Sequence, residues 1–236
     1  MSLCDWPGKV SAVLFIGGCN LRCPTCHNGG LAWRPQDYPS LDRHEAMGFL
    51  ASRSAWLDGV TVTGGEPTTA PGLELLLEDL KTLGLPVKVD TNGQRPDVVE
   101  EIIKHRLADV FAVDVKGPYN KYPELTGGGV DAGTAWDNMQ QIFTLAALNP
   151  EHFYFRTTRV PLLDDQDMET VRAMVPPGFT LTEQNYVSPG RTHAQTDTQE
   201  GWMPGNVVQG PNSQRNIQSP EGGREQRPAA VQAAGA

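Results

Sequence analysis

The chain has 236 residues, of which 19 are Lys or Arg and 28 are Asp or Glu, so its formal net charge is −9 at neutral pH. Such an acidic balance argues against nucleic acid or an anionic membrane as the main partner, because phosphate groups are bound by clustered cations. The N-terminus reads MSLCDWPGKV, with an acid and a proline where a secretory signal is apolar, and the run VSAVLFIGG is too short to span a bilayer. We therefore expect a cytoplasmic protein whose thiols stay reduced.

Apolar runs alternate with amphipathic stretches along most of the chain. Buried strands are predicted at 9–16, 59–64, 86–91, 109–116, 152–160 and 179–187. Helices are predicted between them at 41–56, 71–84, 96–106, 135–149 and 164–175. Strands separated by helices in this way predict right-handed crossovers and a parallel α/β sheet. The pattern alone leaves open whether the sheet is a six-unit open barrel or a doubly wound sheet.

Local signals mark the ends of several of these elements. Ser40 or Asp42 is expected to cap the first predicted helix, and Gly84 is expected to end the second. After Pro189 the composition turns to Gly, Pro, Gln and Ser without an apolar period. We expect a folded domain over residues 1–190 and a low-complexity, disordered tail over 191–236.

Polar or glycine-rich segments follow most of the predicted strands. They are the cysteine loop at 19–26, TGGEPT at 63–68, DTNG at 90–93, DVKGP at 114–118 and SPGR at 188–191. The carboxyl ends of parallel strands share one face of an α/β fold, and that face carries the functional site. These segments therefore predict a single site at the mouth of the sheet.

The cysteine loop carries Cys19, Cys23 and Cys26 in the spacing C-x3-C-x2-C. Zinc held by these thiolates and His27 is one interpretation, but adjacent Cys26 and His27 would make a cramped pair, and structural zinc ligands are usually divided between two hairpins. Three thiolates instead suit a [4Fe–4S] cluster, whose ligands are cysteine sulfurs. One of its four irons would then stay open to a small molecule. The distant Cys4 is expected to be a small buried side chain.

Two of the strand-end segments offer groups that a ligand could contact. Gly64 and Gly65 would expose backbone groups, and Glu66 could sit beside a ligand ammonium, although such a turn is commonly only a βα connection. Asp114 and Lys116 lie two residues apart at a strand end and share a face, so Lys116 could meet a carboxylate. The alternative for this pair is a solvated ion pair.

The fifth predicted strand contains two arginines, and the third ends in an aspartate. Arg156 and Arg159 lie on opposite faces by alternation, so only one of them can point inward, and a buried arginine would need a partner. Asp90 is either a strand cap or an acceptor for an amine or a ribose hydroxyl.

The segments CNLRCPTCHN, TVTGGEPT, DTNG and DVKGPYNKY resemble, in this order and at these separations, the radical S-adenosylmethionine (SAM) enzymes. The opening SLCDWPGKVSAVLFIGGCNLRCPTCHN resembles more closely the activating proteins of anaerobic ribonucleoside-triphosphate reductases. These proteins are glycyl-radical enzyme activases related to the pyruvate formate-lyase activating enzymes. The resemblance covers about residues 1–190 and implies a partial (β/α)6 barrel.

The resemblance also implies roles for single residues. Cys19, Cys23 and Cys26 would hold the cluster, and SAM would chelate the fourth iron through its amino and carboxylate groups. The implied SAM contacts are Gly64, Gly65, Glu66 and Asp90 around the methionine amino end, Asp114 and Lys116 beside the methionine or ribose, Arg156 on the carboxylate side, and Thr25 and His27 beside the adenine. Asn92 is a further implied SAM-binding residue. The position of Thr25 is commonly aromatic in this family.

The implied activity is reductive cleavage of SAM and formation of a glycyl radical on an anaerobic ribonucleotide reductase subunit. A small electron donor such as a flavodoxin would reduce the cluster. Three alternatives stay open on the sequence. They are an activase of the pyruvate formate-lyase type, a radical SAM enzyme acting on a small molecule such as a 7-carboxy-7-deazaguanine synthase, and a zinc-stabilised binding module.

Overall fold

The computed structural model describes residues 1–188, so the predicted tail at 191–236 lies outside the described residues. The strands are β1 (Ser11–Ile16), β2 (Gly59–Gly64), β3 (Val87–Thr91), β4 (Val110–Asp114), β5 (Phe153–Arg159) and β6 (Leu181–Asn185). The α-helices of this range are α1 (Gly29–Trp33), α2 (Arg43–Ala51), α3 (Leu73–Thr82), α4 (Pro96–Lys104), α5 (Tyr122–Leu125), α6 (Ala132–Leu148) and α7 (Asp165–Met174). Every predicted strand and helix has a counterpart in the structure.

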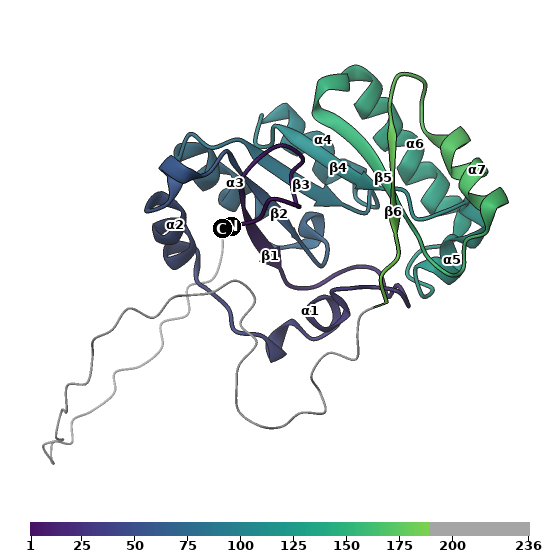
Figure 1. Ribbon diagram of the computed structural model, residues 1–236, viewed down its shortest axis with the longest axis horizontal. Coiled ribbons are helices and arrows are strands. Elements are labelled where there is room, and N and C mark those ends of the chain that lie inside the picture. Colours follow the sequence, from purple (N-terminus) through teal and green to yellow (C-terminus); the bar gives the residue numbers. More distant parts are fainter. Residues whose placement is uncertain (189–236) are drawn as a thin grey trace, which may run out of the picture. The chain divides into compact units, whose positions relative to one another are not determined.

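The strands form one parallel sheet in which spatial order follows chain order from β1 to β6 (Figure 1). Neighbours are in close register, as in the pairs Val89 with Phe111 and Val113 with Phe155. In a doubly wound sheet the spatial order of the strands reverses at a switch point, so an order that follows the chain throughout selects the open barrel. In the described residues β1 pairs only with β2 along its length and β6 only with β5, which leaves the barrel open between its first and last strands.

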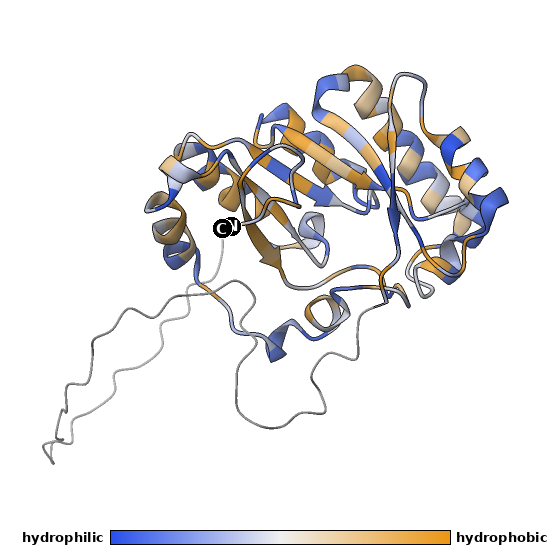
Figure 2. Ribbon diagram, in the orientation of Figure 1, coloured by the Kyte–Doolittle hydropathy of each residue, from blue (hydrophilic) through white to orange (hydrophobic). Residues whose placement is uncertain are grey.

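The core lies between the outer face of the sheet and the helices that cover it. Val62 and Val89 of the strands and Leu77, Ile102 and Met139 of the helices are fully buried in one cluster. Figure 2 shows hydrophobic colouring along the strands and on parts of the helices. Because side chains alternate along a strand, the residues between these core positions face the inside of the barrel, where the polar groups gather.

Helix ends follow the local signals, with one exception. Asp42 caps α2 in a capping box with Glu45, and Pro96 is the first residue of α4. The exception is the end of α2, which stops at Ala51 instead of continuing to residue 56. The hydroxyls of Ser52 and Ser54 donate to carbonyls of the last turn, which competes with continued helix. No helix of the described range combines the length and the hydrophobicity that a membrane crossing requires.

The N-terminal segment folds back onto the sheet. Ser2 and Ser11 form an antiparallel bridge, with N–H to oxygen distances of 2.7 and 2.9 Å. Trp6 is buried and packs over Gly59, where any side chain would collide with its ring. Cys4 is exposed, so the expectation of a buried side chain is wrong. Trp6, two residues further on, takes the buried position instead.

Two leucines of α3 provide a matched test of where the core lies. Leu77 is fully buried and Leu75 is 52% exposed on the same helix. We expect Leu77→Ala to lower the free energy of unfolding by about 3 kcal/mol, because it leaves a cavity. Leu75→Ala should change it by less than about 0.5 kcal/mol. Chemical denaturation followed by circular dichroism measures both, and equal losses would contradict this position of the core.

Candidate functional site

A cavity of about 450 Å³ opens at the carboxyl ends of the strands. Every site residue predicted from the sequence lines it: Cys19, Cys23, Thr25, Cys26, His27, Gly64, Gly65, Glu66, Asp90, Asn92, Asp114, Lys116 and Arg156. A shallower groove of about 590 Å³ lies between α2 and α3, away from the strand ends. The cavity is the candidate functional site because only there do the cysteines and the strand-end charges of the described residues meet.

The three thiols enter the cavity from the loop after β1. Burial is the largest effect on Cys19 and raises the pKa of its thiol to about 11, while the N–H of Leu21, 3.3 Å from its sulfur, opposes the rise. Burial also raises the pKa of Cys23, and the ammonium of Lys116 opposes that rise. Both thiols would therefore stay protonated at neutral pH unless a bound metal centre holds them as thiolates.

The donors at this loop fit an iron–sulfur cluster better than zinc. Within residues 1–188, no three His, Cys, Asp or Glu side chains are grouped as ligands of a single metal ion. A single zinc ion needs its ligands to converge on one point. In a cluster each cysteine sulfur binds a different iron, so an all-thiol set spread around one cavity is suitable.

The glycine turn after β2 is locked against the start of the cysteine loop. The N–H of Gly65 donates to the carbonyl of Ile16, and the N–H of Glu66 donates to the carbonyl of Gly18, both at 2.8 Å. A Cβ on Gly65 would lie 1.8 Å from the Gly18 oxygen, so only glycine allows this approach. The side-chain amide of Asn28 donates to the carbonyl of Gly64 at 3.0 Å. The turn and the cysteine loop therefore hold each other in place.

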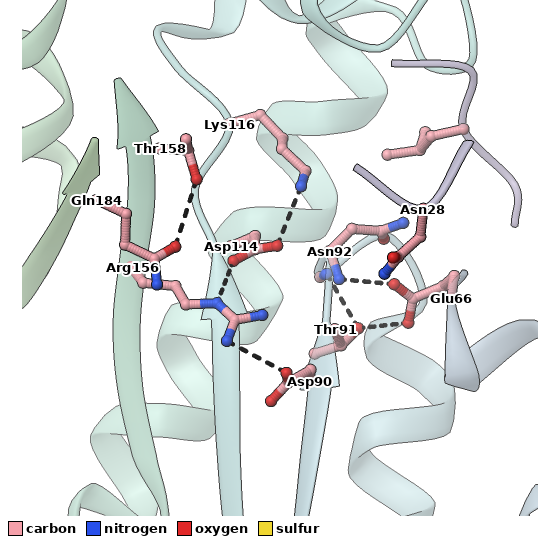
Figure 3. A network of polar contacts seen from close by, with 12 residues as sticks. Asn28, Glu66, Asp90, Thr91, Asn92, Asp114, Lys116, Arg156, Thr158 and Gln184 are labelled. Carbon is pink, nitrogen blue, oxygen red and sulfur yellow. Dashed lines mark hydrogen bonds and ion pairs between the residues drawn. The ribbon is translucent and has the colours of Figure 1, made fainter. Parts of the chain in front are cut away.

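Glu66 is buried beneath this turn with both carboxylate oxygens occupied. One oxygen accepts from the hydroxyls of Thr68 and Thr91 at 2.6 and 2.7 Å and from the N–H of Thr68 at 3.2 Å. The other accepts from the N–H of Asn92 at 2.7 Å (Figure 3). Burial raises the pKa of Glu66, and these donors oppose the rise. The carboxylate therefore fastens the end of β2 to the end of β3.

Five charged side chains alternate in sign across β3, β4 and β5, as Figure 3 shows for four of them. The Lys88 ammonium lies 2.5 Å from Asp90, whose other oxygen lies 3.2 Å from the guanidinium of Arg156. Arg156 also donates to Asp114 at 2.5 Å, and Lys116 lies 3.1 Å from the second oxygen of Asp114. The series contains three cations and two carboxylates, so one positive charge within it is not balanced.

The charged groups of this network determine one another's pKa values. Burial alone would raise the pKa of Asp114, but Arg156 and Lys116 outweigh it and hold that pKa below its usual range. Burial alone would likewise lower the pKa of Lys116 and of Arg156, but Asp114 holds both above their usual values. All three groups are therefore charged at neutral pH.

The structure decides which arginine of β5 faces the cavity. Arg156 points inward, and its side chain is 18% exposed. Arg159 is 46% exposed and pairs with Asp165 on the surface. The alternation rule therefore holds on β5, and Arg156 is the inward residue.

An aromatic residue that the sequence analysis did not single out lies beside the cysteine loop. The ring of His27 stacks on Tyr186, with 5.5 Å between ring centroids, and its Nε2 donates to the carbonyl of Val187 at 2.5 Å. Thr25 lines the same cavity. Tyr186 follows β6 directly, so its position at a strand end is the sequence feature that could have identified it.

The sequence analysis also did not single out Lys88, because an apolar run surrounds it. It lies within the apolar run of the third strand and is fully buried. The signal was its position two residues before Asp90, which places both side chains on the inner face.

Arg156 and Arg159 give a matched test of the charge network. We expect Arg156→Met to lower the free energy of unfolding at pH 7 by about 3 kcal/mol, because it leaves buried carboxylates without their partner. Arg159→Met should cost less than about 1 kcal/mol.

The Arg156→Met defect should also depend on pH, with a sign set by Asp114. Its lowered pKa makes the charged form stabilise the native state above the unfolded value of about 3.9. That contribution is lost as pH falls through the lower native value, so the gap between wild type and variant should narrow in acid. Urea denaturation at pH 7 and at about pH 2, below the unfolded pKa of about 3.9, measures this, and equal defects for both arginines would contradict the network.

Comparison with known proteins agrees with this geometry. The sequence model of the radical SAM superfamily matches residues 13–175. A candidate glycyl-radical enzyme activating enzyme from Methanocaldococcus jannaschii is 35% identical over 177 residues, which cover 74% of this chain and 72% of the relative. A pyruvate formate-lyase-activating enzyme from Clostridium pasteurianum is 35% identical over 55% of this chain and 55% of its own length, so the chain spans about half of that relative.

Two further relatives extend the comparison. A 7-carboxy-7-deazaguanine synthase from Hyperthermus butylicus is 31% identical over 61% of this chain and 60% of its own length. The crystal structure of Streptococcus suis SuiB bound to S-adenosylmethionine superposes with a TM-score of 0.59, covering 75% of this chain and 41% of SuiB at 17% identity. That likeness concerns the fold, and it confirms the partial barrel. The chain belongs to the radical SAM superfamily, whose members use a [4Fe–4S] cluster and SAM, and within it to the glycyl-radical enzyme activating enzymes.

Proposed function

We propose that this chain generates a glycyl radical on an anaerobic ribonucleoside-triphosphate reductase subunit. The observation that carries the proposal is the opening of the barrel between β1 and β6, which in the described residues are not paired with each other. Phe15 of β1 lines the cavity beside this opening and is 53% exposed. An extended glycine-bearing loop of a protein could enter there, whereas a small substrate would favour a closed pocket. The choice of the reductase as the target is supported by the N-terminal sequence at 2–28, which resembles that of the reductase activating proteins.

The cluster would be held by Cys19, Cys23 and Cys26. When bound, the cluster and SAM supply the electron transfer and the radical chemistry. The protein binds, orients and excludes water, and no side chain of the cavity is needed as a general base. A small reductant such as a flavodoxin would provide the electron.

The amino and carboxylate ends of SAM would meet different parts of the cavity wall. The backbone of Gly64 and Gly65 faces the cavity and would take the amino end. The carboxylate would bind at Lys116 and Arg156, the two cations of the network that line the cavity. Glu66 would act by holding the turn, because its oxygens already accept four hydrogen bonds.

The adenine would lie beside the third cysteine of the loop. The resemblance implies a position beside Thr25 and His27, and the ring of Tyr186 stacks on that of His27. We propose that His27, which lines the cavity and is supported by the stacked ring of Tyr186, provides the aromatic surface that Thr25 lacks. Asp90 at the end of β3 and Asn92 in the turn after it would support the amino end.

A second candidate is a radical SAM enzyme that acts on a small nucleobase precursor. It is favoured by the 31% identity to the deazaguanine synthase. The same cavity would then have to bind the precursor directly, and a protein partner would not be modified.

The cysteines provide the test of the cluster itself. We expect Cys19→Ser, Cys23→Ser and Cys26→Ser each to lose most of the iron after anaerobic reconstitution, because each removes one ligand of the cluster. Cys4→Ser should keep about four irons per chain, since Cys4 is exposed on the N-terminal segment. Iron and sulfide analysis measures this, and iron loss in Cys4→Ser would contradict the three-cysteine site.

The activase proposal is tested by radical formation on the partner. Reduced protein, SAM and a reductase subunit should give a glycyl-radical doublet in the electron paramagnetic resonance (EPR) spectrum. Phe15→Ala should lower the radical yield while SAM cleavage continues, because it removes a contact beside the opening. Trp56→Ala is the control, since Trp56 is exposed on the surface and does not line the cavity. If no radical forms but a nucleobase precursor is converted, the second candidate is correct.

A further inference from the structure

The loop between α5 and α6 contains a run of glycines that the site described above does not use. Its backbone turns tightly at 126–129, with the N–H of Gly128 donating to the carbonyl of Pro123 at 2.7 Å. Thr126 is fully buried, and its hydroxyl donates to the carbonyl of Tyr122 at 2.6 Å. The carbonyl of Thr126 accepts the N–H of Arg22 at 2.9 Å. This glycine loop is therefore anchored to α5 on one side and to the cysteine loop on the other.

Two of its glycines are required by contact with the cysteine loop. A Cβ on Gly127 would lie 2.2 Å from the carbonyl oxygen of Arg22, a distance that no side chain can adopt. A Cβ on Gly129 would lie 3.0 Å from the Cα of Leu21. Gly128 differs, because a Cβ there would meet nothing within 4 Å. Among the three glycines, Gly127 and Gly129 thus lie against the backbone of the cysteine loop, and Gly128 does not.

The segment that these glycines support carries a hydrogen bond to a cysteine sulfur. Leu21 is 2% exposed, and its N–H donates to the sulfur of Cys19 at 3.3 Å. On the other side its carbonyl accepts from the indole N–H of Trp33 at 3.2 Å. The position of the Leu21 peptide relative to Cys19 is therefore set by packing from the glycine loop and from Trp33.

We infer that the glycine loop at 126–129 positions the Leu21 N–H on the Cys19 sulfur and thereby raises the reduction potential of the cluster. Reduction adds one electron to the cluster and its thiolates. An N–H aimed at a ligand sulfur stabilises that added negative charge, so hydrogen bonds to sulfur make reduction easier. The inference concerns the cluster and does not depend on which partner is activated.

Three single substitutions separate contact from backbone strain. Gly127 and Gly128 both have left-handed backbones, with φ of 61° and 77°, so alanine is strained to a similar extent at either position. Only Gly127→Ala also pushes on the Arg22 carbonyl. Gly129 is not among the glycines with positive φ, so Gly129→Ala tests the milder contact without that strain.

The experiment is a redox titration of each reconstituted variant without SAM, monitored by the EPR signal of the reduced cluster. We expect the midpoint potential to become more negative in the order Gly127→Ala, then Gly129→Ala, with Gly128→Ala equal to wild type. Unfolding experiments should show that Gly128→Ala also loses stability, through backbone strain without a clash, so strain alone would not produce this order.

Two results would overturn the inference. One is a Gly127→Ala protein that holds a full cluster at the wild-type potential. The other is an equal shift in Gly127→Ala and Gly128→Ala, which would assign the effect to strain. If Gly127→Ala fails to hold a cluster, Gly129→Ala decides: a more negative potential supports the inference, and an unchanged potential rejects it. The titration contains no reductase subunit, so its outcome is separate from that of the activase proposal.

Discussion

The arrangement of the site depends on the buried carboxylate of Glu66. Its oxygens accept hydrogen bonds from Thr68, Thr91 and Asn92, and its own N–H donates to Gly18 at the start of the cysteine loop. Three segments that are distant in sequence therefore meet at one residue. A buried carboxylate is tolerated only when its donors are in place, so the cysteine loop and the turns after β2 and β3 must form together.

The second constraint is the distribution of charge. The whole chain carries a formal net charge of −9, yet the network from Lys88 to Lys116 contains one more cation than carboxylates. Alternation of sign allows these groups to be buried at neighbouring strand ends, because each charge has an opposite neighbour. Lys88 does not line the cavity, so Lys116 and Arg156 are the cations of the network that a ligand there could reach. An anionic group that enters the cavity would therefore meet Lys116 and Arg156.

Much of the fold and of the site follows from the sequence, for physical reasons that also set the limit. Apolar runs and polar strand ends predict the parallel sheet and the residues at its mouth, because both depend on strand periodicity. Helix α1 is not predicted, since its five residues are too few for a period, and Trp33 within it is held by a hydrogen bond to Leu21. Tyr186 and the glycine loop at 126–129 act through contacts between distant segments, which no local pattern records. The buried environment expected for Cys4 fails for the same reason.

The bridge between Ser2 and Ser11 has a consequence for the behaviour of the protein at high concentration. The first and last strands of an open sheet present unpaired backbone groups, which can recruit a strand from another copy. At the start of β1 those groups are already bonded within the chain. On β6, the other edge strand, the exposed Glu183 carries a charge and pairs with Arg172 at 2.6 Å. The fold thus discourages self-association by strand addition while leaving its mouth accessible.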